Sequence, residues 1–194
     1  MPDAPDDATL VRQARKGSEE AFRQIVVRHQ NRVFALLVRI VRDRELAADL
    51  AQESFLKAYR FLDRFDTSRP LKSWLFKIAH NTALDHLRKS QLDTIALETR
   101  EPDRLDPLDR VGDRHAVDPH ASAESRDLGR DLEGAFAALG PLYQELLELR
   151  FREGLSYQEI ADVTGLPMGT VKVRIHRGRQ ALAEHLGARG WLPE

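Results

Sequence analysis

The sequence predicts an all-α protein of two small helical domains joined by a flexible linker. Apolar residues recur at helical spacing through most of the 194 residues, and no segment has the period-two alternation of a strand. A segment rich in proline and acidic residues interrupts this pattern over residues 92–122. Beyond it, two helical segments separated by a glycine have the length and punctuation of a helix-turn-helix.

The composition argues against several classes of protein. The chain has no cysteine, so it forms neither disulfides nor thiolate metal sites. No apolar run approaches the roughly 20 residues that a membrane-spanning helix needs, and the acidic start MPDAPDDATL lacks the pattern of a signal peptide. We therefore expect a cytoplasmic protein without membrane insertion. The net charge of −1 says little, and the distribution of charge is what matters.

The first domain is expected over residues 9–91, after a disordered N-terminus at 1–8. Ser18 is suited to cap a helix whose first turn holds Glu19 and Glu20, because carboxylates favour the positive end of a helix dipole. Asp43 is suited to cap the next helix, which carries ELAADLAQESFLKAYRFL. The break DRFDTSRPL then separates it from the helix that carries KSWLFKIAHNTALDHLRK.

The helix from Leu46 to Leu62 has two distinct faces. Its expected core stripe is Ala47, Ala51, Phe55, Ala58 and Leu62. The opposite stripe is Asp49, Gln52, Glu53, Leu56 and Arg60. Such a stripe is commonly a solvated surface, but this one mixes an exposed leucine with carboxylates and an amide, as protein-contact surfaces do.

The helix around Trp74 carries a different combination of side chains. Phe76, Ala83 and Leu87 make its expected core side. Another side gathers an aromatic ring, an amide and cations: Trp74, Lys77, Asn81 and Arg88. Trp74 read alone is a core tryptophan. The whole set suits single-stranded DNA, because a ring stacks on bases, an amide reads a base edge and cations meet phosphates. The preceding loop DTSRP could receive an unstacked base.

The second domain is expected over residues 123–188, followed by a C-terminal tail at 189–194. Gly140 and Pro141 end one helix and start another, and Gly154 ends that one. The sequence SYQE, from Ser156 to Glu159, fits a capping box. Gly165 then gives a turn, and Pro167 opens the last long helix.

That last helix concentrates positive charge on one side. Its expected core side is Val171, Ile175, Gly178 and Leu182. Its other side holds Thr170, Lys172, Val173, Arg174, His176, Arg177 and Arg179. An ordinary amphipathic surface helix would look similar. The capped short helix and glycine turn before it favour a helix that enters the major groove of DNA, where Lys and Arg meet phosphates or guanine and Val173 meets a thymine methyl.

No pattern in the chain favours catalysis. His80 and Asp85 lie five residues apart and do not share a helix face. The chain has no glycine-rich phosphate loop, no paired-histidine metal motif and no nucleophile elbow. We therefore expect no enzyme activity, no cofactor and no metal site.

Three segments together resemble the extracytoplasmic-function (ECF, group IV) RNA polymerase sigma factors. They are ADLAQESFLKAYR, SWLFKIAHNTALDHLRK and, after the linker, LSYQEIADVTGLPMGTVKVRIHRGRQAL. The resemblance implies that the first domain is a sigma region 2 helical bundle and the second a sigma region 4 helix-turn-helix. It implies as partners the core RNA polymerase, at its β′ clamp helices and β flap, promoter DNA and an anti-sigma factor that controls a stress response.

The resemblance also assigns roles to residues. It implies core-polymerase binding by Asp49, Gln52, Glu53, Phe55 and Leu56, with Phe55 supporting the surface from inside. It implies contact with the −10 element by Trp74, Lys77, Asn81 and Arg88, which would trap a flipped-out base of the non-template strand and so help to melt the promoter. It implies contact with the −35 element by Thr170, Lys172, Val173, Arg174, His176 and Arg177.

In the family the linker threads the polymerase towards the RNA channel. From this we hypothesise that Asp103, Asp106 and Asp109 act in initiation or promoter escape.

Two other functions remain open from the sequence. An autonomous helix-turn-helix regulator with a helical sensing or dimerisation domain would explain the C-terminal half, but it leaves the Trp74–Asn81 face and the long linker without a purpose. A helical enzyme acting on nucleic acid would need an acidic cluster for metal-assisted chemistry, and none is evident.

Overall fold

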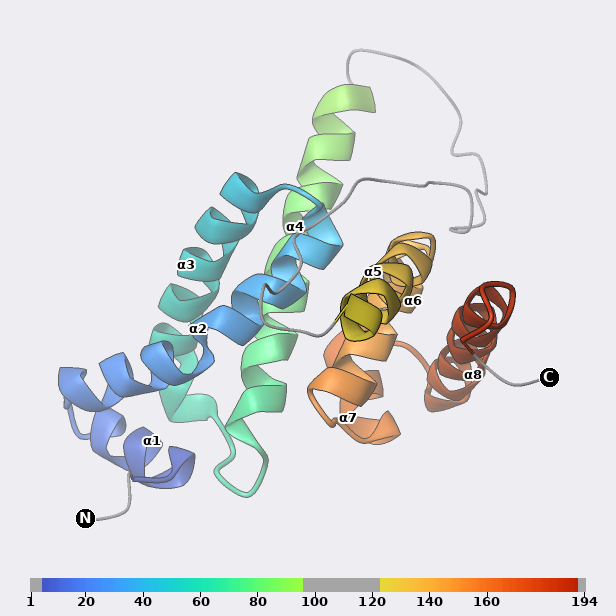
Figure 1. The fold of residues 1–194 in the computed structure, drawn as a ribbon. Coiled ribbons are helices and arrows are strands. Elements are labelled where there is room, and N and C mark those ends of the chain that lie inside the picture. Colours follow the sequence, from blue (N-terminus) through green and yellow to red (C-terminus); the bar gives the residue numbers. More distant parts are fainter. Residues whose placement is uncertain (1–4, 96–122, 192–194) are drawn as a thin grey trace. The chain divides into compact units, whose positions relative to one another are not determined.

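The computed structural model describes residues 5–95 and 123–191 (Figure 1). Every regular element within those residues is a helix, so the all-α prediction is confirmed there. The chain divides into two compact units, which are described separately below. Most of the expected linker, with Asp103, Asp106 and Asp109, lies outside the described residues.

The N-terminal unit is a bundle of three long helices with a short one attached. In chain order its helices are α1 (Asp7–Arg15), α2 (Glu19–Val41), α3 (Arg44–Phe61), the 3-10 turn η1 (Leu62–Arg64) and α4 (Leu71–Ile95). Helices α2, α3 and α4 each pack against the other two. Their shared core includes Ile25, Leu36, Leu37, Phe76 and Ala83, all almost fully buried.

Side-chain caps set where these helices begin. The Ser18 hydroxyl accepts the Ala21 amide at 3.2 Å, and the Asp43 carboxylate accepts the amides of Glu45 and Leu46 at 2.8 and 3.1 Å. Both predicted caps are therefore confirmed. The structure adds a third, because Asp6 accepts the Thr9 amide at 2.8 Å and starts α1 at Asp7. Helix α1 thus begins two residues before the expected start of the first domain at residue 9.

Helix α1 is fastened to the bundle at both ends. Asp7 pairs with Arg28 at 2.7 Å and with the buried ring of His29 at 2.9 Å. Burial lowers the pKa of His29, and the nearby Asp7 carboxylate opposes that effect. At the other end, the Arg15 guanidinium donates to the Leu62 carbonyl at 2.9 and 3.0 Å and to the Phe65 carbonyl. Arg15 therefore anchors the turn that precedes the loop at 66–70.

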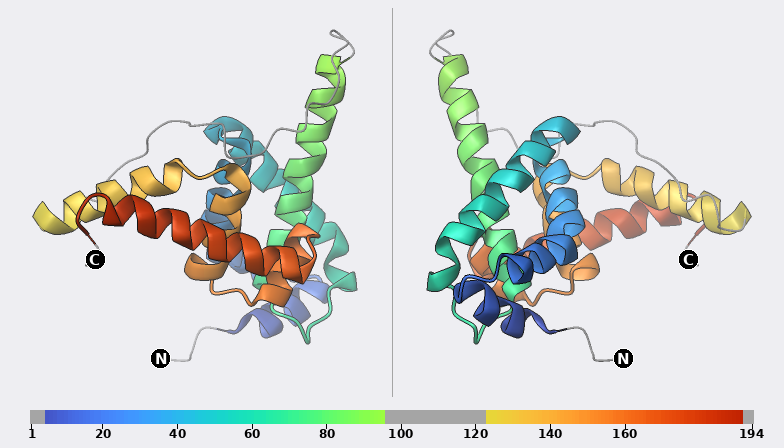
Figure 2. Two further views of the ribbon diagram at one scale, coloured as in Figure 1. Left: turned by 90° about the vertical axis from the view of Figure 1, so that its right-hand side faces the viewer. Right: turned by 90° about the vertical axis from the view of Figure 1, so that its left-hand side faces the viewer.

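The C-terminal unit consists of shorter helices and one long one. In chain order they are α5 (Ala123–Ala137), α6 (Pro141–Leu147), the π-helical turn η3 (Glu148–Arg152), α7 (Tyr157–Thr164) and α8 (Met168–Gly187). Helix α8 packs against α5 and α6, and Figure 2 shows α5 and α8 side by side. The indole of Trp191 donates to Asp131 at 2.7 Å, which ties the segment after α8 to α5.

The predicted helix boundaries of this unit are confirmed, with one small shift at the start of α8. The Glu159 carboxylate accepts the Ser156 amide at 2.8 Å, and the Ser156 hydroxyl accepts the Glu159 amide at 3.2 Å, which is the reciprocal pattern of a capping box. Gly154 and Gly165 have φ of 68° and 70°, a conformation that glycine adopts without strain. Pro167 lies just before α8 rather than inside it.

Helix α8 buries the side that the sequence predicts. Val171, Ile175 and Gly178 are buried, whereas Leu182 is only half-buried. Helix α6 approaches closely at Gly178, because a Cβ there would lie 3.1 Å from Leu147 Cδ1 and 3.3 Å from Tyr143 Cδ1. Gly178 thus allows α6 and α8 to pack together.

We expect Gly178→Val to destabilise the C-terminal unit by about 1–3 kcal/mol, because the added methyls have no space against Leu147 and Tyr143. Thermal unfolding followed by circular dichroism measures the change. Gly169→Ala in the same helix is the matched control, since a Cβ there meets nothing within 4 Å. That control should be neutral or stabilising by about 0.5–1 kcal/mol. Equal unfolding temperatures of Gly178→Val and the wild type would show that α6 and α8 pack loosely at this position.

Candidate protein and nucleic-acid interfaces

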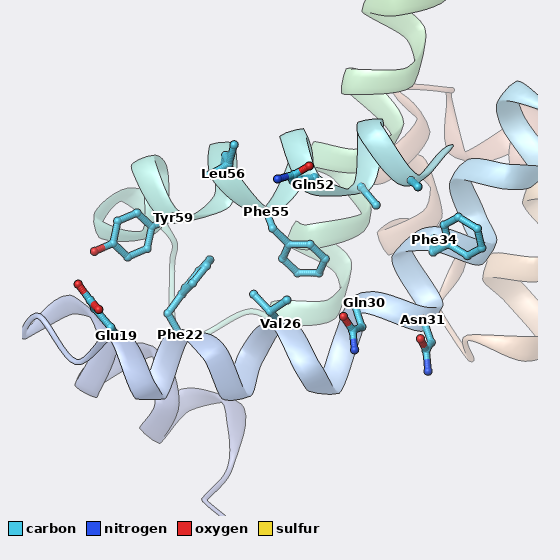
Figure 3. A pocket seen from close by; sticks show the side chains of 12 residues that line it. Glu19, Phe22, Val26, Gln30, Asn31, Phe34, Gln52, Phe55, Leu56 and Tyr59 are labelled. Carbon is cyan, nitrogen blue, oxygen red and sulfur yellow. The ribbon is translucent and has the colours of Figure 1, made fainter. Parts of the chain in front are cut away.

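A groove of about 670 Å³ runs between α2 and α3 (Figure 3). Phe22 and Val26 project from α2 towards α3, and Phe55 projects back from α3. The rings of Phe22 and Tyr59 meet edge to face at the same wall, with their centroids 4.9 Å apart. The polar lining residues are Glu19, Gln30, Asn31 and Gln52. An open apolar trough with polar residues along it suits an apolar protein surface better than a small polar ligand.

The predicted contact stripe of α3 divides at this groove. Gln52 and Leu56 line it, and Leu56 is 54% exposed. Phe55 is 8% exposed and also lines it, which agrees with a supporting position. Asp49 and Glu53 are exposed but do not line the groove, and Glu53 pairs with Lys57 at 2.9 Å.

Sequence reasoning missed the α2 wall of this groove. The buried stripe of α2 follows Ile25, whereas Phe22 and Val26 line the groove. The four-residue spacing of Phe22 and Val26 shows that both lie on one side of α2, but spacing alone does not tell a groove wall from a core stripe. Ala51, expected in the core, is half-buried and lines the groove, so that assignment was wrong.

The predicted DNA face of α4 lies on one side of the helix, because Trp74, Lys77, Asn81 and Arg88 are spaced by three, four and seven residues. Lys77, Asn81 and Arg88 are exposed. Arg88 lies 3.9 Å from Asp85, a loose pair that leaves it open to water. Trp74 is half-buried, with its ring centroid 5.0 Å from that of Phe65. Trp74 is thus neither a fully buried core residue nor a free stacking surface.

The loop at 66–70 precedes this face and is exposed throughout. The Asp66 carboxylate accepts the Ser68 amide at 2.9 Å, and the Asp66 carbonyl accepts the Arg69 amide at 3.0 Å. The hydrogen bond from the Ser68 amide lowers the pKa of Asp66, so its carboxylate stays ionised at neutral pH. These bonds form a compact turn whose side chains are exposed to solvent.

The predicted DNA-binding side of α8 is largely open to water. Lys172, Val173, His176 and Arg177 are exposed, with Val173 at 49%, whereas Thr170 and Arg174 are half-buried. The Lys172 ammonium lies 6.0 Å from the ring centroid of Tyr157, at the start of α7. A cationic helix face with one apolar side chain at its centre can meet both phosphates and base edges.

The described residues add two negative findings. Within residues 5–95 and 123–191, no cluster of three or more His, Asp or Glu is arranged to hold a metal ion. No helix in the same part of the chain is long and apolar enough to span a membrane.

Comparison with known proteins agrees with both units. Residues 25–92 match the Sigma-70 region 2 family and residues 129–182 match the Sigma-70, region 4 family. The chain is 32% identical to the ECF RNA polymerase sigma factor SigW of Bacillus subtilis, over 91% of this chain and 94% of that one. The chain belongs to the ECF RNA polymerase sigma factor family. This ECF sigma factor is also 36% identical to the RNA polymerase sigma-H factor of Pseudomonas aeruginosa, over 93% of each chain.

Solved structures resemble this ECF sigma factor as well. The sigma factor RpoE of Bartonella quintana, in complex with the anti-sigma factor NepR, matches with a TM-score of 0.63 and 26% identity, covering 86% of this chain and 96% of that one. CnrH, in complex with the cytosolic domain of CnrY, matches with a TM-score of 0.61 and 25% identity, covering 94% and 97%. The family resemblance of the sequence is therefore confirmed. The region 2 match includes α3 and the predicted DNA face of α4, and the region 4 match includes the predicted DNA-binding side of α8.

Proposed function

We propose that this protein is a sigma subunit that binds core RNA polymerase through the α2–α3 groove, traps unpaired −10 DNA on α4 and reads the −35 element with α8. The observation that carries the proposal is that one region 2 unit holds both an apolar protein groove and a separate cationic and amide face. An autonomous DNA-binding regulator has no need of the apolar groove. A protein that only binds polymerase has no need of the cationic and amide face.

The groove supports docking of the β′ clamp helices. Its walls offer Phe22, Val26 and Phe55 to apolar side chains of an inserted helix, and Gln52 offers an amide to its backbone or polar groups. Leu56 is positioned to act as an anchor at the α3 rim, because it is both exposed and part of the lining. Asp49 extends the surface with negative charge, which favours a partner with basic residues beside its apolar ones, whereas the charge of Glu53 is offset by its pair with Lys57.

The α4 face supports capture of an unpaired base. Asn81 carries both donor and acceptor groups and is exposed, so it can hydrogen-bond a base edge that pairing no longer occupies. Lys77 and Arg88 are placed to meet the flanking phosphates. A base held in this way offsets part of the few kcal/mol lost in unpairing and unstacking, so the open promoter is favoured. The exposed loop at 66–70 is the place for the flipped base.

The α8 face supports recognition of duplex DNA. Lys172 and Arg177 are exposed cations that reach phosphates or guanine, and Val173 presents methyl groups to a thymine methyl. Thr170 and Arg174, being half-buried, orient the helix or contact the DNA backbone from its margins. In this proposal α8 selects the promoter by reading its −35 element, and α4 favours opening of the two DNA strands at the −10 element.

The proposal extends to regulation and location. RpoE of Bartonella quintana is solved with an anti-sigma factor, and we propose that a protein of this kind controls the present chain in a stress response by covering the same surfaces. We place the protein in the cytoplasm, where polymerase and promoters meet. We further propose that it has no catalytic activity and needs no cofactor, since the chemistry belongs to the polymerase.

Reconstituted transcription tests the proposal. The purified chain is added to bacterial core RNA polymerase with a library of genomic promoter fragments, and the 5′ ends of the transcripts are sequenced. We expect transcripts from a small set of fragments that share two elements, and none from core enzyme or from this protein alone. Site-specific duplex binding by the protein alone, with no transcripts on adding core enzyme, would support the autonomous regulator instead.

A further inference from the structure

A single arginine joins α1 to the backbone just before the loop at 66–70. Arg15 lies in the last turn of α1, where the helix dipole favours a cation. Its guanidinium donates to the Leu62 carbonyl at 2.9 and 3.0 Å and to the Phe65 carbonyl. These partners lie 47 and 50 residues away in the sequence. Helix α1 packs against α2 and η1, beside this turn (Figure 1).

Phe65 is the last buried residue before the loop, and it is fixed from three directions. Its carbonyl accepts from Arg15, and its amide donates to the Leu62 carbonyl at 3.1 Å. Its side chain is 5% exposed, and its ring centroid lies 5.0 Å from that of Trp74 on the α4 face. The start of the loop is therefore held against α4, although the residues at 66–70 are all exposed.

A loop held in this way binds a ligand at lower cost. Each residue that becomes ordered on binding loses backbone entropy, and a loop that is already in place has less to lose. A guanidinium suits this task because its planar fork of N–H donors holds several acceptors in a fixed relative position, which the single ammonium of lysine does not. Arg15 is half-buried and directs this fork at backbone carbonyls.

We propose that Arg15 is a positioning residue for base capture, which holds the loop at 66–70 beside the α4 face before DNA arrives. This inference rests on the proposed function, in which the flipped base enters that loop. Helix α1 then takes part in promoter opening through the loop and not through a contact with DNA. The effect concerns the captured base alone, because Lys77 and Arg88 meet the phosphates from α4 itself.

Binding of single-stranded DNA by reconstituted holoenzyme tests the positioning role. One oligonucleotide carries the −10 element of a promoter that the wild type uses. A second has an abasic residue at the position where loss of the base costs the wild type most affinity. Arg15→Ala should bind the intact oligonucleotide about five- to 30-fold more weakly, which corresponds to about one additional loop residue ordered on binding. Its affinity for the abasic oligonucleotide should change little.

Arg28→Ala is the matched control, because it loosens the other end of α1. Arg28 pairs with Asp7 at 2.7 Å and donates to the Pro5 carbonyl at 2.8 Å, and neither partner adjoins the loop. This variant should keep the wild-type preference for the intact oligonucleotide. Arg15→Lys keeps the charge but not the fork, so its preference should fall in the same direction. It carries the test if thermal unfolding shows that Arg15→Ala is poorly folded.

The two oligonucleotides separate failure of the positioning role from failure of the proposed function. An unchanged preference in the Arg15 variants, or equal weakening for both oligonucleotides, would overturn the positioning role and leave the proposed function intact. The same loss of preference in Arg28→Ala would also overturn it, because α1 docking as a whole would then be responsible. A wild-type holoenzyme that binds intact and abasic oligonucleotides equally would overturn base capture, and the positioning role with it.

Discussion

Asn81→Ala should prevent most promoter opening while leaving the protein bound to core polymerase. A base-edge contact of this kind contributes about 1–3 kcal/mol, so the open-complex equilibrium should fall by about five- to 150-fold. The physical reason is that Asn81 is the exposed amide on the α4 face, with cations on either side of it in Lys77 and Arg88. Permanganate footprinting measures opening, and co-elution with core enzyme measures assembly.

His86→Ala provides the control for that experiment, because His86 is exposed on the same helix about 140° away from Asn81. It should open promoters as the wild type does. On a template with a pre-formed bubble at the −10 element, the Asn81→Ala defect should shrink, since the cost of unpairing is already met. Loss of core binding by Asn81→Ala would mean that the α4 face contacts the polymerase rather than DNA.

Leu56→Glu should weaken binding to core polymerase by about 30-fold or more, the effect of removing one interface anchor of about 2 kcal/mol. The substitution places a charge at the rim of the apolar groove, where a docked partner would remove it from water. Because Leu56 is 54% exposed in the free protein, the fold should not change. Competition against a labelled wild-type chain for core enzyme measures the loss.

Val27→Glu is the matched control for the groove. Val27 is 60% exposed on α2 and does not line the groove, so its replacement introduces the same charge on the same unit. It should bind core enzyme with the affinity of the wild type. Equal weakening by both variants would indicate a general effect of charge rather than docking in the groove.

Helix-capping residues in the sequence predicted well where several helices begin. Ser18, Asp43 and the Ser156–Glu159 pair each satisfy helix amides within three residues of themselves, so the sequence alone contains what is needed to place them. The core side of α8 was predicted for the same reason, because Val171, Ile175 and Gly178 repeat at helical spacing. The family was predicted from three motifs in order, and this is confirmed.

The groove could not be predicted because it depends on how α2 and α3 pack. Phe22 and Val26 are apolar and lie at helical spacing, so a single helix wheel places them in the core with Ile25. The groove is formed by residues of both helices, so it is apparent only once α2 and α3 are packed together. Trp74 illustrates the same limit, since its partial cover comes from Phe65, which lies across the loop at 66–70. The roles of the site residues themselves remain predictions.

Footprinting of one selected promoter with and without core polymerase tests the central claim most directly. The claim is that α4 and α8 are two DNA contacts of one polymerase-borne subunit. We predict that the protein and core enzyme together protect two separate elements and expose unpaired thymines at the downstream one, whereas neither does so alone. Strong protection of a single site by the protein alone, unchanged by core enzyme, would contradict the account.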